Sequence, residues 1–250
     1  MKSALLPADW PAPPGVHAFT TLRYGAGCSA APFDTFNLGG RYAPDGDFSE
    51  SIEANRAQLA GLLGLPSEPS WLRQVHGVDA LRVEAPLLDA PEVDATVTSV
   101  PGVVLAILTA DCLPVLFCAE DGSEVGAAHA GWRGLAHGIL ESTLARMDTP
   151  PQRLMAWLGP SAGAAHYEVG ADVRAAFVEV DPGAADAFVP TRPGHWLCDL
   201  DRLARRRLAA AGLHRVHGGG LSTIGDPGRF FSHRRDGRSG RMATLIWREA

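Results

Sequence analysis

Three residues that can bind a metal stand in short turns of this sequence. They are His76 in Arg-Gln-Val-His-Gly, Cys112 in Thr-Ala-Asp-Cys-Leu-Pro, and His129 in His-Ala-Gly-Trp-Arg-Gly. Because Cys112 and His129 stand at the ends of neighbouring predicted strands, we expect both side chains to point into one pocket. Two imidazoles and one thiolate form a three-ligand zinc site whose fourth position is open to water or substrate. Zinc there would lower the pKa of a bound water or polarise a substrate oxygen.

The same residues also fit a reaction that uses no metal. Cys112 would then be a nucleophile and His129 its base, with Asp111 or another polar group orienting the imidazole. A structural interpretation is open as well, because a cysteine beside apolar strands is often an inert buried residue. Residue chemistry alone does not separate the metal site from the nucleophile. The other three cysteines are expected to be packing or loop residues.

Buried strands and one helix are predicted to position these residues. Val103–Leu108 and Val115–Ala119 are apolar runs typical of strands buried on both faces, and Val125–Ala130 is a third strand of small residues. Gly131–Gly134 is predicted to turn the chain into a helix of about four turns. Further predicted elements are a helix over 47–63 with an Asp47/Glu50 capping box and a stop at Gly64, a strand over 94–98, helices over 170–180 and 199–211, and a final strand over 243–247.

The order of these elements indicates the fold class. Strands and helices are mixed without a regular β-α-β rhythm, which favours an α/β fold of α+β character over a doubly wound sheet. We expect mixed β-sheets flanked by helices in a single layered domain over 1–250, with an irregular N-terminal segment over 1–15. No dinucleotide-binding or P-loop motif occurs.

Composition excludes several classes of protein. The 250 residues include 22 Lys+Arg and 28 Asp+Glu, a net charge of 22 − 28 = −6, which argues against a nucleic-acid binder. Four widely spaced cysteines without a C-x-x-C pair make a poor disulfide scaffold or four-thiolate zinc module, so a reducing cytoplasmic location is expected. Asp111 and Pro114 interrupt the longest apolar run, so no membrane span or targeting segment is predicted.

Ten short motifs extend in order over most of the chain. They are Phe33–Gly39, Glu53–Arg56, Gln74–Gly77, Asp94–Ala95, Thr109–Val115, His129–Gly134, Leu158–Pro160, Tyr167–Gly170, Phe230–Gly237 and Gly240–Ala243. In this order, from Phe19 to Trp247, the sequence resembles the bacterial laccase-domain family. Its members carry the names multicopper polyphenol oxidase and purine nucleoside phosphorylase.

The resemblance implies a fold, a metal site and a reaction. The family's metal ligands fall on His76, Cys112 and His129, with zinc as the metal or copper in its place. The implied reaction is phosphorolysis of adenosine, inosine and methylthioadenosine to the free base and (methylthio)ribose 1-phosphate. Adenosine deamination is a further implied activity, and the implied fold is layered α/β with mixed sheets in one monomeric domain.

This chain departs from the family pattern in two places. Many relatives have a cysteine or proline within the stretch that is Gly-Ala-Ala-His here, which ends at His166. Many also have a cysteine where this chain has Ser222-Thr223. Neither change affects the three ligands, but His166 is expected near a pocket wall, where it could alter substrate preference.

Phosphorolysis requires cationic groups on the phosphate. The first candidate is Arg133, which is close to His129 in sequence. Arg23 and Arg234 are weaker candidates for phosphate or substrate, and Asn37 is a further candidate substrate contact. For Arg235, an ion pair with Asp236 is favoured. Asp111 is a candidate to accept a proton, order a water, or orient a ligand imidazole.

Three further functions are compatible with some of these residues. A four-copper oxidase needs about ten histidines, whereas this chain has nine and no His-x-His pair. Weak oxidase activity with copper in the zinc site stays open, because copper outcompetes zinc at such ligands. The second function is that of a cysteine amidase or hydrolase acting on cell-wall precursors, and the third is that of a non-enzymatic partner-binding protein.

Overall fold

The computed structural model describes residues 3–39 and 46–249, and helices and strands are mixed along the chain. The strands are β1 (Leu5–Pro7), β2 (Val16–Thr21), β3 (Ala80–Arg82), β4 (Ala95–Thr98), β5 (Leu105–Thr109), β6 (Leu113–Ala119), β7 (Val125–Ala130), β8 (Leu154–Leu158), β9 (Glu168–Gly170), β10 (Phe188–Pro190), β11 (His195–Cys198), β12 (Arg215–Gly218) and β13 (Met242–Arg248). The helices are α1 (Ser49–Leu63), α2 (Trp132–His137), α3 (Ile139–Arg146), α4 (Ala171–Val178), α5 (Leu200–Ala210), α6 (His233–Asp236) and the 3₁₀ turns η1 (Pro151–Arg153) and η2 (Pro182–Ala187).

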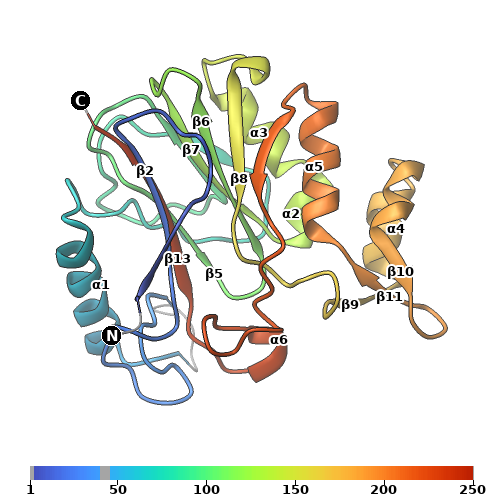
Figure 1. The fold of residues 1–250 in the computed structure, drawn as a ribbon, viewed down its shortest axis with the longest axis horizontal. Helices are drawn as coiled ribbons and strands as arrows, with labels where there is room; N and C mark the ends of the chain where they lie inside the picture. The colour runs from blue at the N-terminus through green and yellow to red at the C-terminus, as the bar shows by residue number, and fades with distance from the viewer. Residues whose placement is uncertain (1–2, 40–45, 250) are drawn as a thin grey trace.

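Two sheets pack against each other in the centre of the molecule (Figure 1). One has the strand order β1-β2-β13-β5, and the other has the order β12-β8-β6-β7-β4-β3. Helix α1 lies on the outer side of the first sheet, and α2, α3 and α5 lie on the outer side of the second. A third sheet, β10-β11-β9, projects from one side together with α4. The predicted fold of mixed sheets flanked by helices is therefore confirmed.

The apolar runs of the sequence form strands between these layers. On β5, Leu105 and Ile107 face the second sheet, whereas Val104 before it and Ala106 within it face α1. On β6 every residue is buried, because Leu116 and Cys118 face the first sheet while Val115 and Phe117 face the helices. This two-sided burial explains why these strands are continuously apolar rather than alternating.

The structure corrects several predicted element boundaries. The four-turn helix predicted after Gly131 is two helices, α2 and α3, because Gly138 between them has a left-handed φ of 107°. Strand β6 begins at Leu113 and so includes Pro114, and the final strand is two residues longer than predicted. Strands β8 and β9–β12 were not predicted, because their short segments lack a clear period.

The predicted helix ends are partly confirmed. Helix α5 begins after Asp199, whose carboxylate accepts a hydrogen bond from Arg202 N, and α1 ends at Gly64 as predicted. The predicted Asp47/Glu50 capping box is wrong, because the N-cap of α1 is Phe48 without a side-chain bond. The segment over 1–15 is not wholly irregular either, since its described residues include β1, which pairs with β2.

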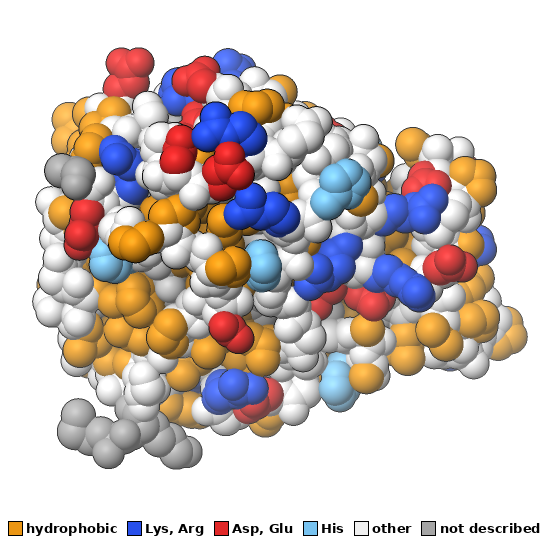
Figure 2. Space-filling view, turned by 45° about the horizontal axis from the view of Figure 1, so that its top comes forward, with side chains coloured by type: hydrophobic (Ala, Val, Ile, Leu, Met, Phe, Trp, Pro, Cys, Tyr) orange, Lys and Arg blue, Asp and Glu red, His pale blue; other side chains and the backbone are white. Residues whose placement is uncertain are grey.

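Figure 2 shows hydrophobic and charged side chains on one face of the molecule. Hydrophobic side chains gather on the left of this view and along the edge of the projecting lobe on the right, and basic and acidic side chains are interspersed between them. Within the described residues, no helix has both the length and the apolar character that a membrane span requires.

Candidate functional site

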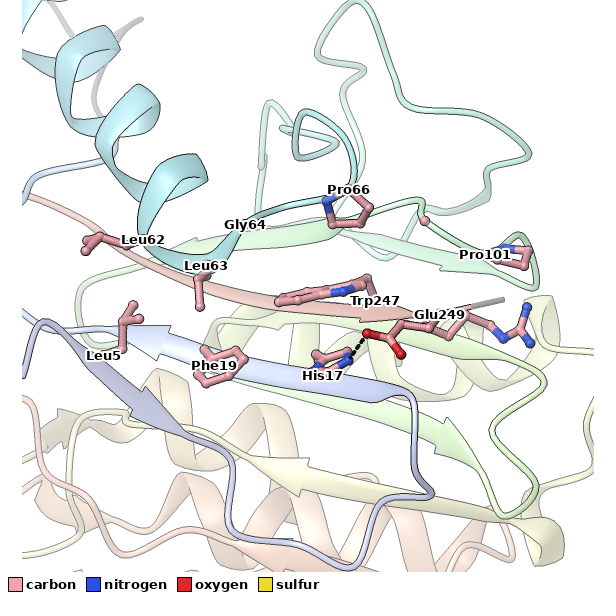
Figure 3. A pocket seen from close by; sticks show the side chains of 12 residues that line it. Leu5, His17, Phe19, Leu62, Leu63, Gly64, Pro66, Pro101, Trp247 and Glu249 are labelled. Atoms are coloured by element: carbon pink, nitrogen blue, oxygen red, sulfur yellow. Dashed lines mark hydrogen bonds and ion pairs between the residues drawn. The ribbon is translucent and has the colours of Figure 1, made fainter.

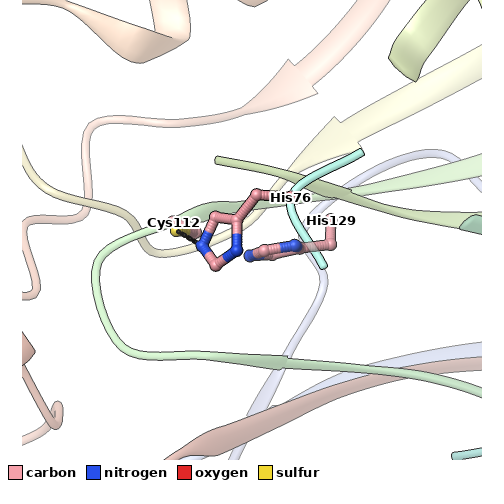
Figure 4. Close-up of side chains that lie close together, drawn as sticks. All are labelled: His76, Cys112 and His129. Atoms are coloured by element: carbon pink, nitrogen blue, oxygen red, sulfur yellow. Dashed lines mark hydrogen bonds between the residues drawn. The ribbon is translucent and has the colours of Figure 1, made fainter. Parts of the chain in front are cut away.

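The three predicted ligands converge at one end of the second sheet (Figure 4). Cys112 directly precedes β6, and His129 is the penultimate residue of the paired strand β7. His76 comes from the loop before β3, where its φ of 61° is left-handed. Cys112 Sγ lies 3.8 Å from His76 Nε2, and the ligand atoms of all three residues lie within 4.8 Å of one another. The structure thus brings together the trio predicted from the sequence.

A fully buried carboxylate, that of Asp94, organises this cluster from behind. Its Oδ1 accepts a hydrogen bond of 2.7 Å from His129 Nδ1, so the other imidazole nitrogen, Nε2, is available to a metal. Its two oxygens also accept hydrogen bonds from the backbone N–H groups of Val75, His76 and Gly77, at 3.1, 3.0 and 2.7 Å. Asp94 therefore orients one ligand and shapes the loop that carries another.

The cluster changes the protonation of its members. Burial alone would raise the pKa of the Cys112 thiol, but the imidazoles of His129 and His76 lower it overall to about 6. Burial alone would lower the pKa of His129, but Cys112 and Asp94 raise it overall. By contrast, burial raises the pKa of Cys118 and of Cys198 to about 12, so these two thiols stay protonated. Of these three thiols, only Cys112 is prepared to bind a metal or attack a substrate.

The residues present fit a zinc ion. Two nitrogens and one sulfur suit zinc, whose tetrahedral bonds of about 2.0–2.3 Å place ligand atoms about 3.5 Å apart. A Cβ atom at Gly131 would lie 2.9 Å from His76 Cδ2 and 3.0 Å from Cys112 Sγ, so only glycine leaves room for the ligands. Within residues 3–39 and 46–249, this is the one group of three or more side chains that could hold a metal ion.

The cluster opens onto a cavity of about 670 Å³. This volume suits a small-molecule ligand rather than a macromolecule. On its wall the Arg56 guanidinium lies 4.1 Å from the centre of the Trp71 ring and donates to Leu38 O. The residues that line the cavity are Arg56, Trp71, Leu72, Arg73, Gln74, His76, Leu87, Leu88, Asp89, Ala90, Leu108, Thr109, Ala110, Cys112, His129, His233 and Arg241.

Asp111 is next to Cys112 but is engaged elsewhere. Its Oδ1 accepts a 2.6 Å hydrogen bond from Thr223 Oγ1, and its Oδ2 accepts a 2.7 Å bond from Arg234 N at the start of α6. The carboxylate that contacts a ligand imidazole is that of Asp94, which the sequence reasoning assigned no role. The available signal was a lone carboxylate directly before a buried strand.

The predicted phosphate and substrate residues do not line this cavity in the described part of the chain. Arg23 pairs with Asp34 and Asp236, at 3.2 and 3.5 Å. Arg234 donates to Glu168 O, and the Arg133 guanidinium lies 4.4 Å from the centre of the Trp132 ring. Their proposed contacts with substrate stay predictions.

Two further sequence predictions have definite structural outcomes. Asn37 is fully buried, and its Oδ1 accepts hydrogen bonds from Gly39 N and Arg241 N, so it supports the cavity wall from behind. Arg235 forms the predicted ion pair with Asp236, at 2.8 Å.

The two departures from the family pattern contact each other. Ser222 Oγ and His166 Nδ1 share a hydrogen bond of 3.1 Å. A Cβ atom at Gly163 would lie 2.5 Å from Ser222 Cβ, which shows how tightly this loop packs. Neither Ser222 nor His166 is among the residues that line the cavity. Ser222 and His166 therefore contact each other outside the cavity lining. Their effect on substrate preference stays a prediction.

Comparison with known sequences identifies close relatives. Residues 16–249 match the family described as multi-copper polyphenol oxidoreductase laccase. A protein of Xylella fastidiosa (strain 9a5c) named purine nucleoside phosphorylase is 61% identical over 252 residues, which cover 98% of this chain and 97% of that protein. Purine nucleoside phosphorylase YfiH of Escherichia coli (strain K12) is 45% identical over 245 residues, covering 98% and 99%.

Solved structures of similar proteins have the same fold. The Neisseria meningitidis protein NMB0706 is 44% identical, with a TM-score of 0.94 over 99% of this chain and 100% of that chain. YlmD from Geobacillus stearothermophilus is 32% identical, with a TM-score of 0.91 over 100% of this chain and 98% of that chain.

Proposed function

This chain belongs to the multi-copper polyphenol oxidoreductase laccase family, and from that premise we propose that it is a zinc-dependent purine nucleoside phosphorylase. Relatives 45–61% identical over nearly the whole chain carry the name purine nucleoside phosphorylase, which supports this reaction. The observation that carries the proposal is the His76–Cys112–His129 cluster, which opens onto a cavity of nucleoside size with arginines on its wall.

The proposed reaction exchanges one bond at the ribose. A phosphate oxygen forms a bond to C1′, the C1′–N9 bond breaks, and its electron pair moves to the purine, which takes up a proton. The products are the free base and ribose 1-phosphate. Arginine side chains on the cavity wall hold the phosphate, and the surrounding apolar side chains exclude water that would otherwise hydrolyse the same bond.

The metal would be held by His76, Cys112 and His129. A zinc ion supplies a Lewis acid at the cavity wall. Asp94 fixes the orientation of His129, and its hydrogen bonds to the His76 loop hold the second imidazole toward the first. We propose adenosine, inosine and methylthioadenosine as substrates, with adenosine deamination as a side activity. The cytoplasmic location and the monomeric state stay predictions.

The direct test follows the products of adenosine in the presence and absence of phosphate. The zinc-loaded chain is expected to release adenine and ribose 1-phosphate only when phosphate is present, and a chelator is expected to abolish the release. Inosine formed without phosphate would reveal the deaminase activity. No adenine at saturating phosphate would refute the proposed phosphorylase, and adenine with free ribose would identify a hydrolase instead.

The geometry also supports a second candidate function, a metal-free cysteine hydrolase. Cys112, His129 and Asp94 follow one another as nucleophile, base and orienting carboxylate, with the last contact at 2.7 Å. Cell-wall-type amides are the substrate class for this second function. It predicts amide cleavage by metal-free protein that is blocked by alkylation of Cys112, whereas the phosphorylase requires the metal.

The family description names copper, so oxidase activity of copper-loaded protein is a third function to test. Copper can replace zinc at imidazole and thiolate ligands. A four-copper centre needs about ten histidines, and the chain has nine. Oxidase activity is therefore expected only from copper-loaded protein. If zinc-loaded protein oxidised phenols as fast as copper-loaded protein does, this assignment would be contradicted.

A further inference from the structure

One cation of the cavity wall, Arg241, donates side-chain hydrogen bonds to backbone carbonyls. Arg241 stands directly before β13 and shares the cavity with Cys112 and His129. Its Nη1 donates to Ser239 O and Gly240 O, at 2.7 and 3.1 Å, and no carboxylate in the described part of the chain forms an ion pair with it. Burial lowers the pKa of Arg241 below its usual value, while Cys112 and Asp111 nearby oppose this effect.

The motif around Asn37 holds Arg241 in place. Asn37 Oδ1 accepts a 2.7 Å hydrogen bond from Arg241 N, and Leu38 N donates a 3.0 Å bond to Arg241 O. A Cβ atom at Gly39 would lie 2.8 Å from Arg241 Cβ, so this glycine allows the close approach. Hydrogen bonds on both its N–H and its carbonyl fix the backbone of Arg241. A fixed backbone limits where the guanidinium can lie, and binding sites require side chains that are held in this way.

We propose that Arg241 forms the subsite for inorganic phosphate. The proposal rests on the proposed function for the identity of the anion, and it replaces Arg133 as the leading phosphate residue. A guanidinium without a carboxylate partner offers paired donors to phosphate oxygens. The shared cavity then places phosphate beside the metal cluster.

The test compares two folded variants with the wild-type enzyme. Arg241→Gln is expected to raise the KM for phosphate by about 30-fold or more, because it removes charged hydrogen bonds. The KM for adenosine is expected to change little in this variant. Arg215→Gln, which removes a surface arginine paired with Glu120, is the matched control.

Wild-type phosphate KM in folded Arg241→Gln would overturn the proposal, as would a large rise in Arg133→Gln alone. If Arg241→Gln does not fold, Arg241→Lys keeps the charge but not the paired donors, and the same rise in phosphate KM is expected. Unchanged phosphate KM in Arg241→Lys would then reject the subsite.

Direct binding separates this proposal from the proposed function. Calorimetric titration with inorganic phosphate is expected to show binding to the wild-type protein and none to Arg241→Gln. A wild-type protein that binds phosphate through Arg241 but releases no adenine would refute the phosphorylase and keep the subsite. Tighter binding of adenosine 5′-monophosphate at Arg241, in competition with phosphate, would show that the subsite serves a nucleotide and would overturn its assignment to free phosphate.

Discussion

Two cavities of nearly equal size contain the same kind of residue pair. The cavity lined by His76, Cys112 and His129 has a volume of about 670 Å³. Behind its wall, His129 Nδ1 lies 2.7 Å from Asp94 Oδ1. A second cavity of about 660 Å³, which we call the α1 groove, lies between the end of α1 and strands β2 and β13 (Figure 3). Its lining includes His17 paired with Glu249 at 2.8 Å.

The two pairs differ in exposure and in neighbours. The side chains of His129 and Asp94 are 3% and 0% exposed, whereas those of His17 and Glu249 are 36% and 65% exposed. His17 stacks on Trp247 with ring centres 5.0 Å apart, and apolar side chains line most of the rest of the groove. Burial and a nearby thiol, rather than cavity volume or the histidine–acid pair, therefore distinguish the candidate site.

The largest expected effect breaks the cluster itself. Cys112→Ser is expected to lower zinc affinity by at least about 100-fold and to abolish turnover, because a hydroxyl is a poor zinc ligand. Zinc per chain after dialysis against a competing chelator measures the effect. Cys28→Ser, at an exposed cysteine, is the matched control. A full equivalent of tightly held zinc in Cys112→Ser would remove the thiol from the metal site.

The next effect tests the buried carboxylate. Asp94→Asn is expected to weaken zinc binding by about 10–100-fold, since groups that orient a ligand imidazole have this magnitude. It is also expected to cost about 2–4 kcal/mol in the free energy of unfolding, because the buried His129 imidazole loses a charged partner and partly buried N–H groups of the His76 loop lose an acceptor. Urea unfolding of the metal-free protein measures this cost. Unchanged stability and zinc affinity together would show that Asp94 does not organise the cluster.

A smaller effect tests the space around the ligands. Gly131→Ala places a methyl group against His76 and Cys112, and overpacking of this kind is expected to weaken zinc binding about 10-fold. Gly61→Ala is the matched control, because a Cβ atom there has nothing within 4 Å. Within α1 that control is expected to stabilise the protein by about 0.5–1 kcal/mol. Equal zinc affinity in both variants would mean that the cluster adapts freely.

The smallest effect is expected in the α1 groove. Glu249→Gln removes the exposed partner of His17, and exposed ion pairs contribute about 0–1 kcal/mol. We expect unfolding free energy within that range of the wild type and unchanged zinc affinity and turnover. A loss as large as that of Asp94→Asn would show that exposure does not explain the difference between the two pairs.

Local patterns in the sequence were sufficient for part of this description. His76, Cys112 and His129 stand out by residue type and by their turns, and the apolar runs of β5 and β6 identify strands buried on both faces. Periodicity and the stop at Gly64 located α1, and the N-cap Asp199 located α5, because these signals act over a few neighbouring residues. The fold class and the grouping of these three residues could therefore be predicted without the structure.

Only the tertiary structure decided which other side chains reach the site. Pairing of β13 with β5 brings Arg241, directly before β13, to the cavity that Cys112 and His129 also line. The contact of Asp94, directly before β4, with His129 on β7 joins two neighbouring parts of the second sheet. The same packing directs Arg23 into ion pairs and buries Asn37. A single sequence does not show these outcomes, because they depend on contacts between residues far apart in the chain, where no local pattern records the partner.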